Sequence, residues 1–287
     1  MGTTMDVTGD GFSLHVLGRP GPSGDPCLAL MHQYVEGWYS TPDLKVEAHG
    51  RQTGDGNFQT PADRVLYESR TVTAHVLAYG RNRDEVVAWA ETLHRAVGGL
   101  VTVSVSDGGR TTWARGYCQL NFEADHYEDA MPGTLTVVCD DPRRYGAARS
   151  AVLAPAGPSG GLVFHAGEPR GLVWPLSFGD GSPSAQRAVL VNEGTARAYP
   201  VLECAGVDAG FSVLDADGRG VTCASTGGWQ PLVLDCLSRT ATVAGVDRTR
   251  DLRRRDFFSV PPGGTLALSL HGTARGSVTC RWHDTYI

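Results

Sequence analysis

Alternation of apolar and polar residues is clearest in the first half of the chain. Residues 70–79 place small or β-branched apolar side chains at every second position, which is the spacing of a strand with one buried face. Residues 107–109, Asp-Gly-Gly, are typical of a tight hairpin turn. Similar apolar or alternating runs lie on either side of that turn and further along, at residues 100–105, 112–122 and 133–139. The pattern predicts an antiparallel meander.

One segment of this half has helical spacing instead. Asn82 is followed three residues later by Glu85, the arrangement of an N-cap with an acidic partner. Gly98 and Gly99 supply the stop signal. Between these signals the apolar residues recur every three or four positions, at Val86, Ala90, Leu93 and Val97. The order of strand, helix and meander predicts an α+β first domain, residues 1–146.

The second half has a different rhythm. Residues 154–161 are rich in Pro, Gly and Ala, which disfavour both helix and inner strand, so we expect a linker over residues 147–170. Residues 171–287 show no helical pattern. They contain short strand-like runs at regular spacing: residues 172–178, 188–191, 199–204, 211–214, 221–224, 231–234, 240–243, 257–260, 266–270 and 278–283. This spacing predicts an antiparallel β-sandwich, and a chain that is mainly β with one helix.

Length and composition agree with two folded domains. The 287 residues are 41% hydrophobic and 20% charged, enough apolar material for a core. No run approaches the length of a membrane helix, and residues 1–10 lack a signal-peptide pattern, so we expect a non-secreted protein without membrane insertion. Seven cysteines without a C-x-x-C pair predict buried, reduced thiols and no metal site.

Charge is distributed unevenly between the two halves. Residues 1–150 hold 13 basic and 19 acidic side chains, and the remainder is balanced. Neither half is basic enough to predict a nucleic-acid-binding face. The one cationic cluster, residues 248–256, carries five Arg against two Asp, and we interpret it as a solvated loop or the edge of a hairpin.

The search for chemistry finds little. Residues 157–161 match G-x-S-x-G, but Pro155 and Pro158 precede the serine and an apolar strand-like run follows in place of a helix, so the match is fortuitous. Asp215 and Asp217 imitate the start of a calcium loop, although Arg219 occupies a ligand position, which favours a β-turn. No P-loop or dinucleotide motif occurs, and histidines show no ligand spacing. We therefore expect no catalytic residue, metal or cofactor, and no enzyme.

Aromatic residues of the second half allow one binding hypothesis. Trp174, Trp229 and Trp282 lie in or near predicted strands, where tryptophan more often packs in a core than stacks on a sugar. If one of them is exposed as a glycan platform, Trp229 is the candidate.

Several stretches in their order along the chain resemble the distal tail protein (Dit) family of siphophages, the long-tailed, non-contractile bacteriophages. In the first half these are residues 50–56, 70–79, the predicted helix and 140–145. In the second half they are residues 174–178, 191–202, 234–240, 257–264 (Phe-Phe-Ser-Val-Pro-Pro-Gly-Gly) and the closing Arg-Trp-His-Asp-Thr-Tyr-Ile, 281–287. The resemblance covers nearly the whole chain. The glycine-rich residues 18–25 do not match, which leaves the register of the first strands open.

The resemblance implies a structural protein of the virion. The first domain is expected to form a ring around a channel, most simply of six copies, and the second to be a galectin-like sandwich that projects outward. The partners would be the tail tube protein and the tail-tip, baseplate and receptor-binding proteins. The location would be the distal end of the tail, after assembly in the bacterial cytoplasm.

Particular residues follow from this expectation. Arg51, Asp55 and Phe58 are candidates for the contact between ring subunits. The acidic excess of the first half suggests a negative channel wall through which DNA passes without specific binding. Its candidates are Glu123, Asp125, Glu128 and Asp129.

Three other functions stay open on the sequence. A carbohydrate-binding adhesin would use an exposed aromatic residue of the sandwich. A cell-wall hydrolase would need converging carboxylates or a metal site, and the sequence offers no such constellation. Another minor tail protein or a tube subunit would share the ring domain, but a tube subunit normally has a single domain.

Overall fold

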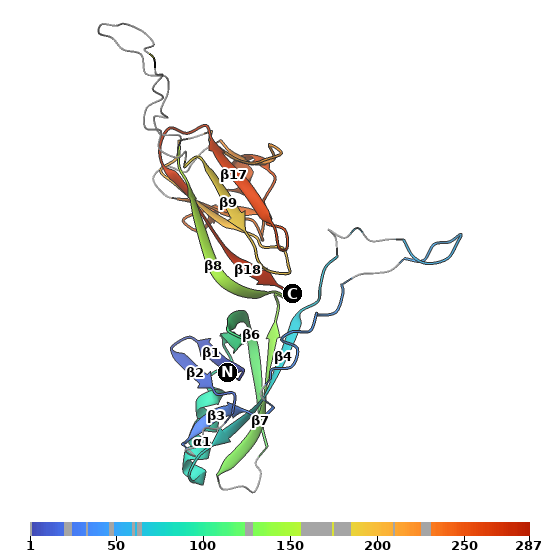
Figure 1. Cartoon of the computed structure of the whole chain (residues 1–287), viewed down its shortest axis with the longest axis vertical. Helices are drawn as coiled ribbons and strands as arrows, with labels where there is room; N and C mark the ends of the chain where they lie inside the picture. Colours follow the sequence, from blue (N-terminus) through green and yellow to red (C-terminus); the bar gives the residue numbers. More distant parts are fainter. Residues whose placement is uncertain are drawn as a thin grey trace. The chain divides into compact units, whose positions relative to one another are not determined.

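The computed structural model describes residues 2–19, 25–32, 34–45, 49–58, 61, 65–123, 129–155, 174, 185–208, 210–224 and 231–287. The chain divides into two compact units, of which the first is Met1–Ala147 together with Tyr286–Ile287 and the second is Ala148–Thr285 (Figure 1). The last two residues of the chain therefore return to the first unit. The expected boundaries did not include this return.

The first unit is a strongly curved sheet of seven strands. Their bounds are β1 Thr4–Gly9, β2 Phe12–Val16, β3 Cys27–Leu30, β4 Arg70–Tyr79, β5 Leu100–Asp107, β6 Arg110–Phe122 and β7 Ala130–Cys139. The order across the sheet is β2-β1-β5-β6-β7-β4-β3, and the paired strands are antiparallel. The predicted meander corresponds to β5, β6 and β7, and β4, the strand predicted before the helix, pairs with β7.

The two ends of this sheet meet. Leu17, the residue after β2, forms a parallel bridge with Ala29 on β3. The Leu17 amide donates to the Leu28 carbonyl at 2.8 Å, and the Leu30 amide donates to the Leu17 carbonyl at 2.7 Å. These bonds give the sheet the closure of a barrel, and closure satisfies the backbone groups that an open edge would expose. The inward face is apolar, with Val7, Val76, Val103 and Leu135 at most 1% exposed.

The predicted helix is present as α1, Arg83–His94. The Asn82 side chain accepts a hydrogen bond from the Glu85 amide at 3.0 Å, and the Glu85 carboxylate accepts one from the Arg81 amide at 2.8 Å. These bonds satisfy amides that the first turn leaves free. Buried Val86, Ala90 and Leu93 face β4, β6 and β7. Val97 was wrong as a fourth helical core position, because the helix has ended and its side chain is 44% exposed.

Strand β8, Arg144–Leu153, continues from the first unit into the second. It occupies the first part of the segment expected to be a linker, so any linker begins no earlier than Ala154. Alanine, glycine and serine at residues 146–148 and 150 lack the bulk that signals a strand in a sequence. From residue 156 onward the expected linker lies outside the described residues, as does the expected strand at 172–178 apart from Trp174.

The second unit consists of two antiparallel sheets. One has the order β15-β14-β13-β10-β18-β8, and the other β16-β12-β11-β17-β9. The bounds are β9 Arg187–Val191, β10 Val201–Ala205, β11 Ser212–Asp215, β12 Gly220–Cys223, β13 Leu232–Asp235, β14 Thr240–Val243, β15 Val246–Asp247, β16 Leu252–Arg255, β17 Thr265–His271 and β18 Ser277–Tyr286. Buried side chains from both sheets form one apolar core, so the described part of this unit is a sandwich.

Most of the predicted strands of this unit occur within one or two residues of their expected place. Residues 257–260 were expected to be a strand and are not. The strand is β16, inside the cationic cluster, and it forms the edge of its sheet. Strong aromatic and β-branched character at 257–260 reflects burial of Phe258 and Val260 in the core and not backbone pairing along a strand. Among the described residues, the only helical segment besides α1 is a three-residue 3-10 turn, Thr249–Asp251.

All seven cysteines are free and buried. Burial raises the pKa of the Cys139 thiol to about 11 and that of Cys280 to about 12. Thiols with such values carry almost no thiolate at neutral pH and behave as small apolar side chains. The prediction of buried, reduced thiols is confirmed.

Candidate functional site

The first unit carries a two-stranded ribbon, residues 41–69, which we call the arm. The arm projects from the sheet just before β4 and ends where that strand begins, at Arg70. Its two sides are antiparallel at bridges Leu44–Tyr67 and Gly50–Asn57. Backbone hydrogen bonds of 2.8–3.0 Å support the pairing, from Lys45 to Leu66, Glu68 to Asp43, Arg51 to Gly56 and Phe58 to His49.

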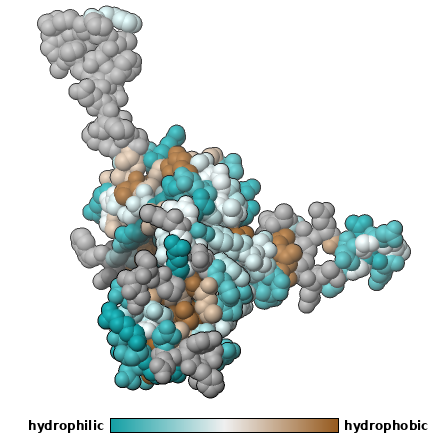
Figure 2. Space-filling view, turned by 60° about the horizontal axis from the view of Figure 1, so that its bottom comes forward, coloured by the Kyte–Doolittle hydropathy of each residue, from teal (hydrophilic) through white to brown (hydrophobic). Residues whose placement is uncertain are grey.

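The arm has no core of its own. None of its described residues is buried, and the side chains of Leu44, Phe58 and Leu66 are 59%, 67% and 59% exposed. Figure 2 shows apolar surface on this ribbon beside a hydrophilic tip. A two-stranded hairpin is at best marginally stable in water without a surface to pack against. The arm therefore has the character of a docking element.

The residues expected at a subunit contact all lie on the outer part of the arm. Arg51 and Asp55 belong to the turn that reverses the ribbon, and Phe58 follows it on the returning side. The structure thus brings the three together on one exposed segment.

Arg70 fixes the base of the arm. It is the first residue of β4, its side chain is inside the unit, and the residue is 1% exposed. Its guanidinium donates to the carbonyls of Gly37, Ser40 and Pro142 at 2.6, 2.7 and 2.8 Å, and to that of Trp38 at 3.1 Å. Three of these carbonyls lie just before the arm begins. One side chain therefore holds together the points where the arm leaves and returns.

The positive charge of Arg70 is stabilised by the dipoles of backbone carbonyls and not by an anion among the described residues. Burial, together with the positive charge of neighbouring Arg144, lowers its pKa to about 10. At neutral pH the group is still protonated, and four carbonyl oxygens face it. Arg70 was not predicted as a site residue, yet the sequence contains a signal for its burial. It has the same alternation phase as Val72 and Ala74, and so belongs to the buried face of its strand.

Arg144, on β8, is the second buried cation near this base. It is 6% exposed, and its guanidinium lies 5.0 Å from the centre of the Tyr39 ring and 5.8 Å from that of Trp38. It also lies 5.9 Å from the ring of Tyr286, the residue by which the chain end rejoins the first unit. Contacts of this kind contribute about 1–2 kcal/mol each when they are desolvated. Through these contacts Arg144 packs against both the base of the arm, at Trp38 and Tyr39, and the end of the chain, at Tyr286.

The acidic residues proposed for a channel wall are placed only in part. Glu123 directly follows β6 and Asp129 directly precedes β7, and both are exposed. They flank the turn of a hairpin. Asp125 and Glu128, which complete the set, lie outside the described residues.

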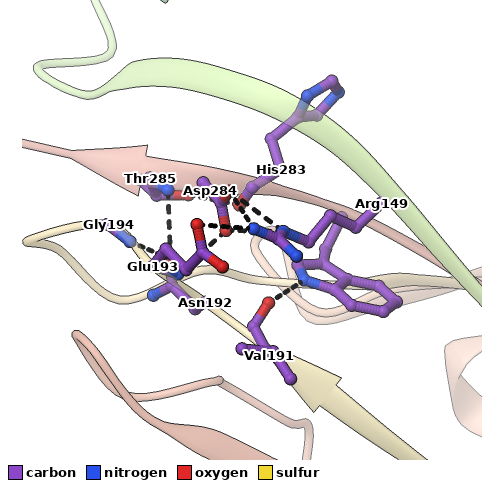
Figure 3. Close-up of polar contacts among 9 residues, drawn as sticks. Arg149, Val191, Asn192, Glu193, Gly194, His283, Asp284 and Thr285 are labelled. Atoms are coloured by element: carbon purple, nitrogen blue, oxygen red, sulfur yellow. Dashed lines mark hydrogen bonds and ion pairs between the residues drawn. The ribbon is translucent and has the colours of Figure 1, made fainter. Parts of the chain in front are cut away.

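The second unit contains a polar network built around two buried residues, Asn192 and Asp284, and shown in Figure 3. Arg149 on β8 binds the Asp284 carboxylate on β18 through Nε at 2.9 Å and through a terminal nitrogen at 2.8 Å. The same terminal nitrogen lies 2.9 Å from the Glu193 carboxylate. The Asp284 carboxylate, whose side chain is 4% exposed, also accepts a bond from the Glu193 amide at 2.9 Å. The buried carboxylate is thereby fully paired.

Asn192 completes this network from the centre. It is 0% exposed, and its carbonyl oxygen accepts bonds from the amides of Gly194 and Thr285 at 3.0 and 3.2 Å. Its amide nitrogen donates to the Ala196 carbonyl at 2.8 Å. Gly194 is required because a Cβ there would lie 1.9 Å from the Thr285 oxygen. The loop after β9 is thus fastened to the end of β18.

The tryptophans of the second half separate into three cases. Trp282 is a core residue, 6% exposed, whose indole nitrogen donates to the Val191 carbonyl at 2.7 Å. Trp174 is 80% exposed. Trp229, the candidate glycan platform, lies outside the described residues, as does the G-x-S-x-G match at 157–161. Asp215 caps a turn, as expected, by accepting from the amides of Asp217 and Arg219.

Within the described part of the chain, no three His, Cys, Asp or Glu side chains lie close enough together to hold a metal ion. No helix among those residues has the length and apolar character needed to cross a membrane.

Replacing Arg70 by Met should lower the free energy of unfolding by about 2–4 kcal/mol, because four buried carbonyls lose their donor. It should also speed proteolytic cleavage between residues 41 and 69. Chemical denaturation and limited proteolysis measure the two effects. Arg115→Met, at an exposed position of β6, is the control. Equal stability and equal cleavage in the two variants would contradict the assignment of Arg70 to the arm base.

Replacing Arg149 by Leu should cost about 3–5 kcal/mol, because it leaves the Asp284 carboxylate buried and without its cation. Arg281 forms a pair of 2.6 Å with Glu203 on the surface of the same sandwich. Arg281→Leu should cost less than about 1 kcal/mol, because solvent screens exposed pairs. Denaturant titration of both variants provides the comparison, and similar costs would show that the network does not stabilise the unit.

Comparison with known proteins supports the expectation of the fold. No protein-family model matches the sequence, and no curated protein is detectably similar to it. Among solved structures, the Dit protein (gp 19.1) of phage SPP1 matches with a TM-score of 0.61 and 15% identity, over 99% of each chain. That protein is described as a paradigm of the hub of the adsorption apparatus in phages that infect Gram-positive bacteria.

Two weaker likenesses are to chains of the phage P2 baseplate in its activated conformation. The structure with Ca matches with a TM-score of 0.46 and 9% identity over 98% of each chain, and that with Sr with 0.43 and 9% over 97%. At 15% identity, the match to SPP1 Dit establishes a shared fold and not a shared role. The resemblance to distal tail proteins that the sequence indicated is therefore confirmed at the level of the fold, along the whole chain.

Proposed function

We propose that this protein is a distal tail protein, a structural hub whose copies form a ring at the end of a non-contractile phage tail. The observation that carries this proposal is the fold shared with SPP1 Dit over 99% of both chains. The match spans both units in their order along the sequence. In such a role the protein works through its contacts with partners, and the proposal assigns it no catalytic group and no cofactor.

The first unit is the ring-forming domain in this proposal, and the arm is the contact between neighbouring copies. A ring arises when one surface of each copy binds a different surface of the next and the rotation closes. The arm suits the first of these surfaces, because it is exposed, partly apolar and uncovered by the described residues of its own chain. Six copies are the expected number, with Arg51, Asp55 and Phe58 at the contact.

The second unit is the outward domain in this proposal, a galectin-like sandwich that docks tail-tip, baseplate and receptor-binding proteins. The tail tube protein would contact the ring formed by the first unit. Both partners place the protein at the distal end of the tail. A sandwich fold does not itself confer sugar binding, because the binding site and not the fold decides this. Trp229, the aromatic residue on which the adhesin alternative depends, lies outside the described residues.

Replacing Phe58 by Asp should convert the assembly to single copies, because a buried aromatic at an interface contributes about 2 kcal/mol or more at each contact. Sedimentation velocity of the purified full-length protein measures the change. Val246→Asp is the matched control, since Val246 is a similarly exposed apolar residue (58%) on β15 of the second unit. An unchanged assembly in Phe58→Asp, or equal loss in both variants, would refute the arm contact.

The acidic wall of the channel is a further part of the proposal. Glu123 and Asp129 are exposed at the hairpin between β6 and β7, where negative charge would repel the phosphates of passing DNA. Charge reversal of both residues to Lys should slow DNA ejection from assembled particles by roughly tenfold, because the phosphates would be attracted. Asp217→Lys, in the second unit, is the control. Ejection kinetics equal to those of the unaltered particle would exclude these two residues from the wall.

A further inference from the structure

The second unit contains a cationic pocket that the hub role does not use. Three parts of the sandwich supply most of its lining: the turn between β11 and β12, the turn between β13 and β14, and the end of β16 with the segment that follows it. Leu266 of β17 completes the lining. The cavity measures about 560 Å³, within the range of small-molecule sites. Arginines come from each part, namely Arg219, Arg239, Arg254 and Arg255.

The pocket carries an excess of positive charge that its own residues do not neutralise. Its two carboxylates are already engaged: Asp215 caps its turn, and Asp256 pairs with Arg254 at 3.0 Å. Arg254 also donates to the Gly218 carbonyl at 2.6 Å, which fixes its position. The side chains of Arg219 and Arg239 have no hydrogen bond or ion pair with any residue that the structure describes. Ten N–H donors are thus free in these two groups.

Arg239 is an unusual choice for its backbone position. Its φ is 57°, in the left-handed region, where an L side chain costs about 1–2 kcal/mol and Gly or Asn is preferred. The turn does not require arginine, because Asp235 already caps it by accepting from the Leu237 amide at 2.8 Å. A role of the Arg239 guanidinium in ligand binding would explain why an arginine occupies a position where it lowers stability.

The lining points to one kind of ligand. Guanidinium groups bind phosphate oxygens in pairs with matched geometry. The walls are mainly polar and lack the apolar centre of a protein-docking surface. Phe257 and Leu266, both half-buried, supply a small apolar side, which suits the carbon face of a sugar. We infer that this pocket binds a phosphate-bearing sugar, with Arg219 and Arg239 on the phosphate.

The test is calorimetric titration of the full-length protein with glucose 1-phosphate, inorganic phosphate and glucose at constant ionic strength. Glucose 1-phosphate should bind most tightly, inorganic phosphate more weakly, and glucose not at all. The double variant Arg219→Gln, Arg239→Gln should weaken binding of glucose 1-phosphate by roughly tenfold or more, because two charge-assisted donors are lost. Both arginines are exposed, so the fold should survive, and an unchanged thermal midpoint checks this.

Arg253→Gln is the matched control, because Arg253 is an exposed arginine of β16 that does not line the pocket. Three results would overturn the inference. The first result is that glucose 1-phosphate fails to bind. The second is that the control variant Arg253→Gln weakens binding as much as the double variant does. The third result is that an oligoglutamate peptide binds while both phosphates do not, which would make the pocket a docking site for protein.

Discussion

A two-stranded ribbon in water must find a surface to cover it, and this constraint bears on the whole first unit. The sheet of that unit closes on itself through Leu17 and Ala29, so its strand ends are largely satisfied within the chain. The arm is the exception, because it pairs with itself and exposes Leu44, Phe58 and Leu66. Arg70 holds its base at the cost of burying a cation among carbonyls. Such a fixed base and uncovered ribbon are most useful when copies of the chain assemble.

The second unit is subject to a different constraint, the anchoring of its two ends. The chain passes between the units twice, after Ala147 and after Thr285. Both passages are anchored close to where they begin. Arg149 follows the first passage and Asp284 precedes the second, and the two residues form the buried ion pair of Figure 3. Such a pair contributes less to net stability than to a defined arrangement of its strands. We interpret it as the element that fixes where both strands enter and leave the sandwich.

The sequence predicted the helix and the longer strands well, and it predicted the pairing of the first strands and the backbone at residues 257–260 poorly. The alternation in β4 and the capping of α1 are local signals, and both elements occur where they were expected. Strands β1 and β2 form a local hairpin across Asp10 and Gly11. The pairing of β1 with β5 and of β3 with β4 joins segments that are far apart in the chain, and the sequence does not reveal it. The aromatic residues at 257–260 predicted a strand because burial and strand formation favour the same residue types.

The candidate sites depend even more on tertiary structure. Arg70 could have been found from its alternation phase, whereas Arg219 and Arg239 lie on different hairpins and converge only in the fold. Arg51, Asp55 and Phe58 remain predicted contact residues, and their partner surface belongs to another copy in the proposed assembly. The measurement that tests the account most directly is electron microscopy of the purified full-length protein. The account predicts closed rings of six copies with a central opening, and a uniform population of single copies at high protein concentration would contradict it.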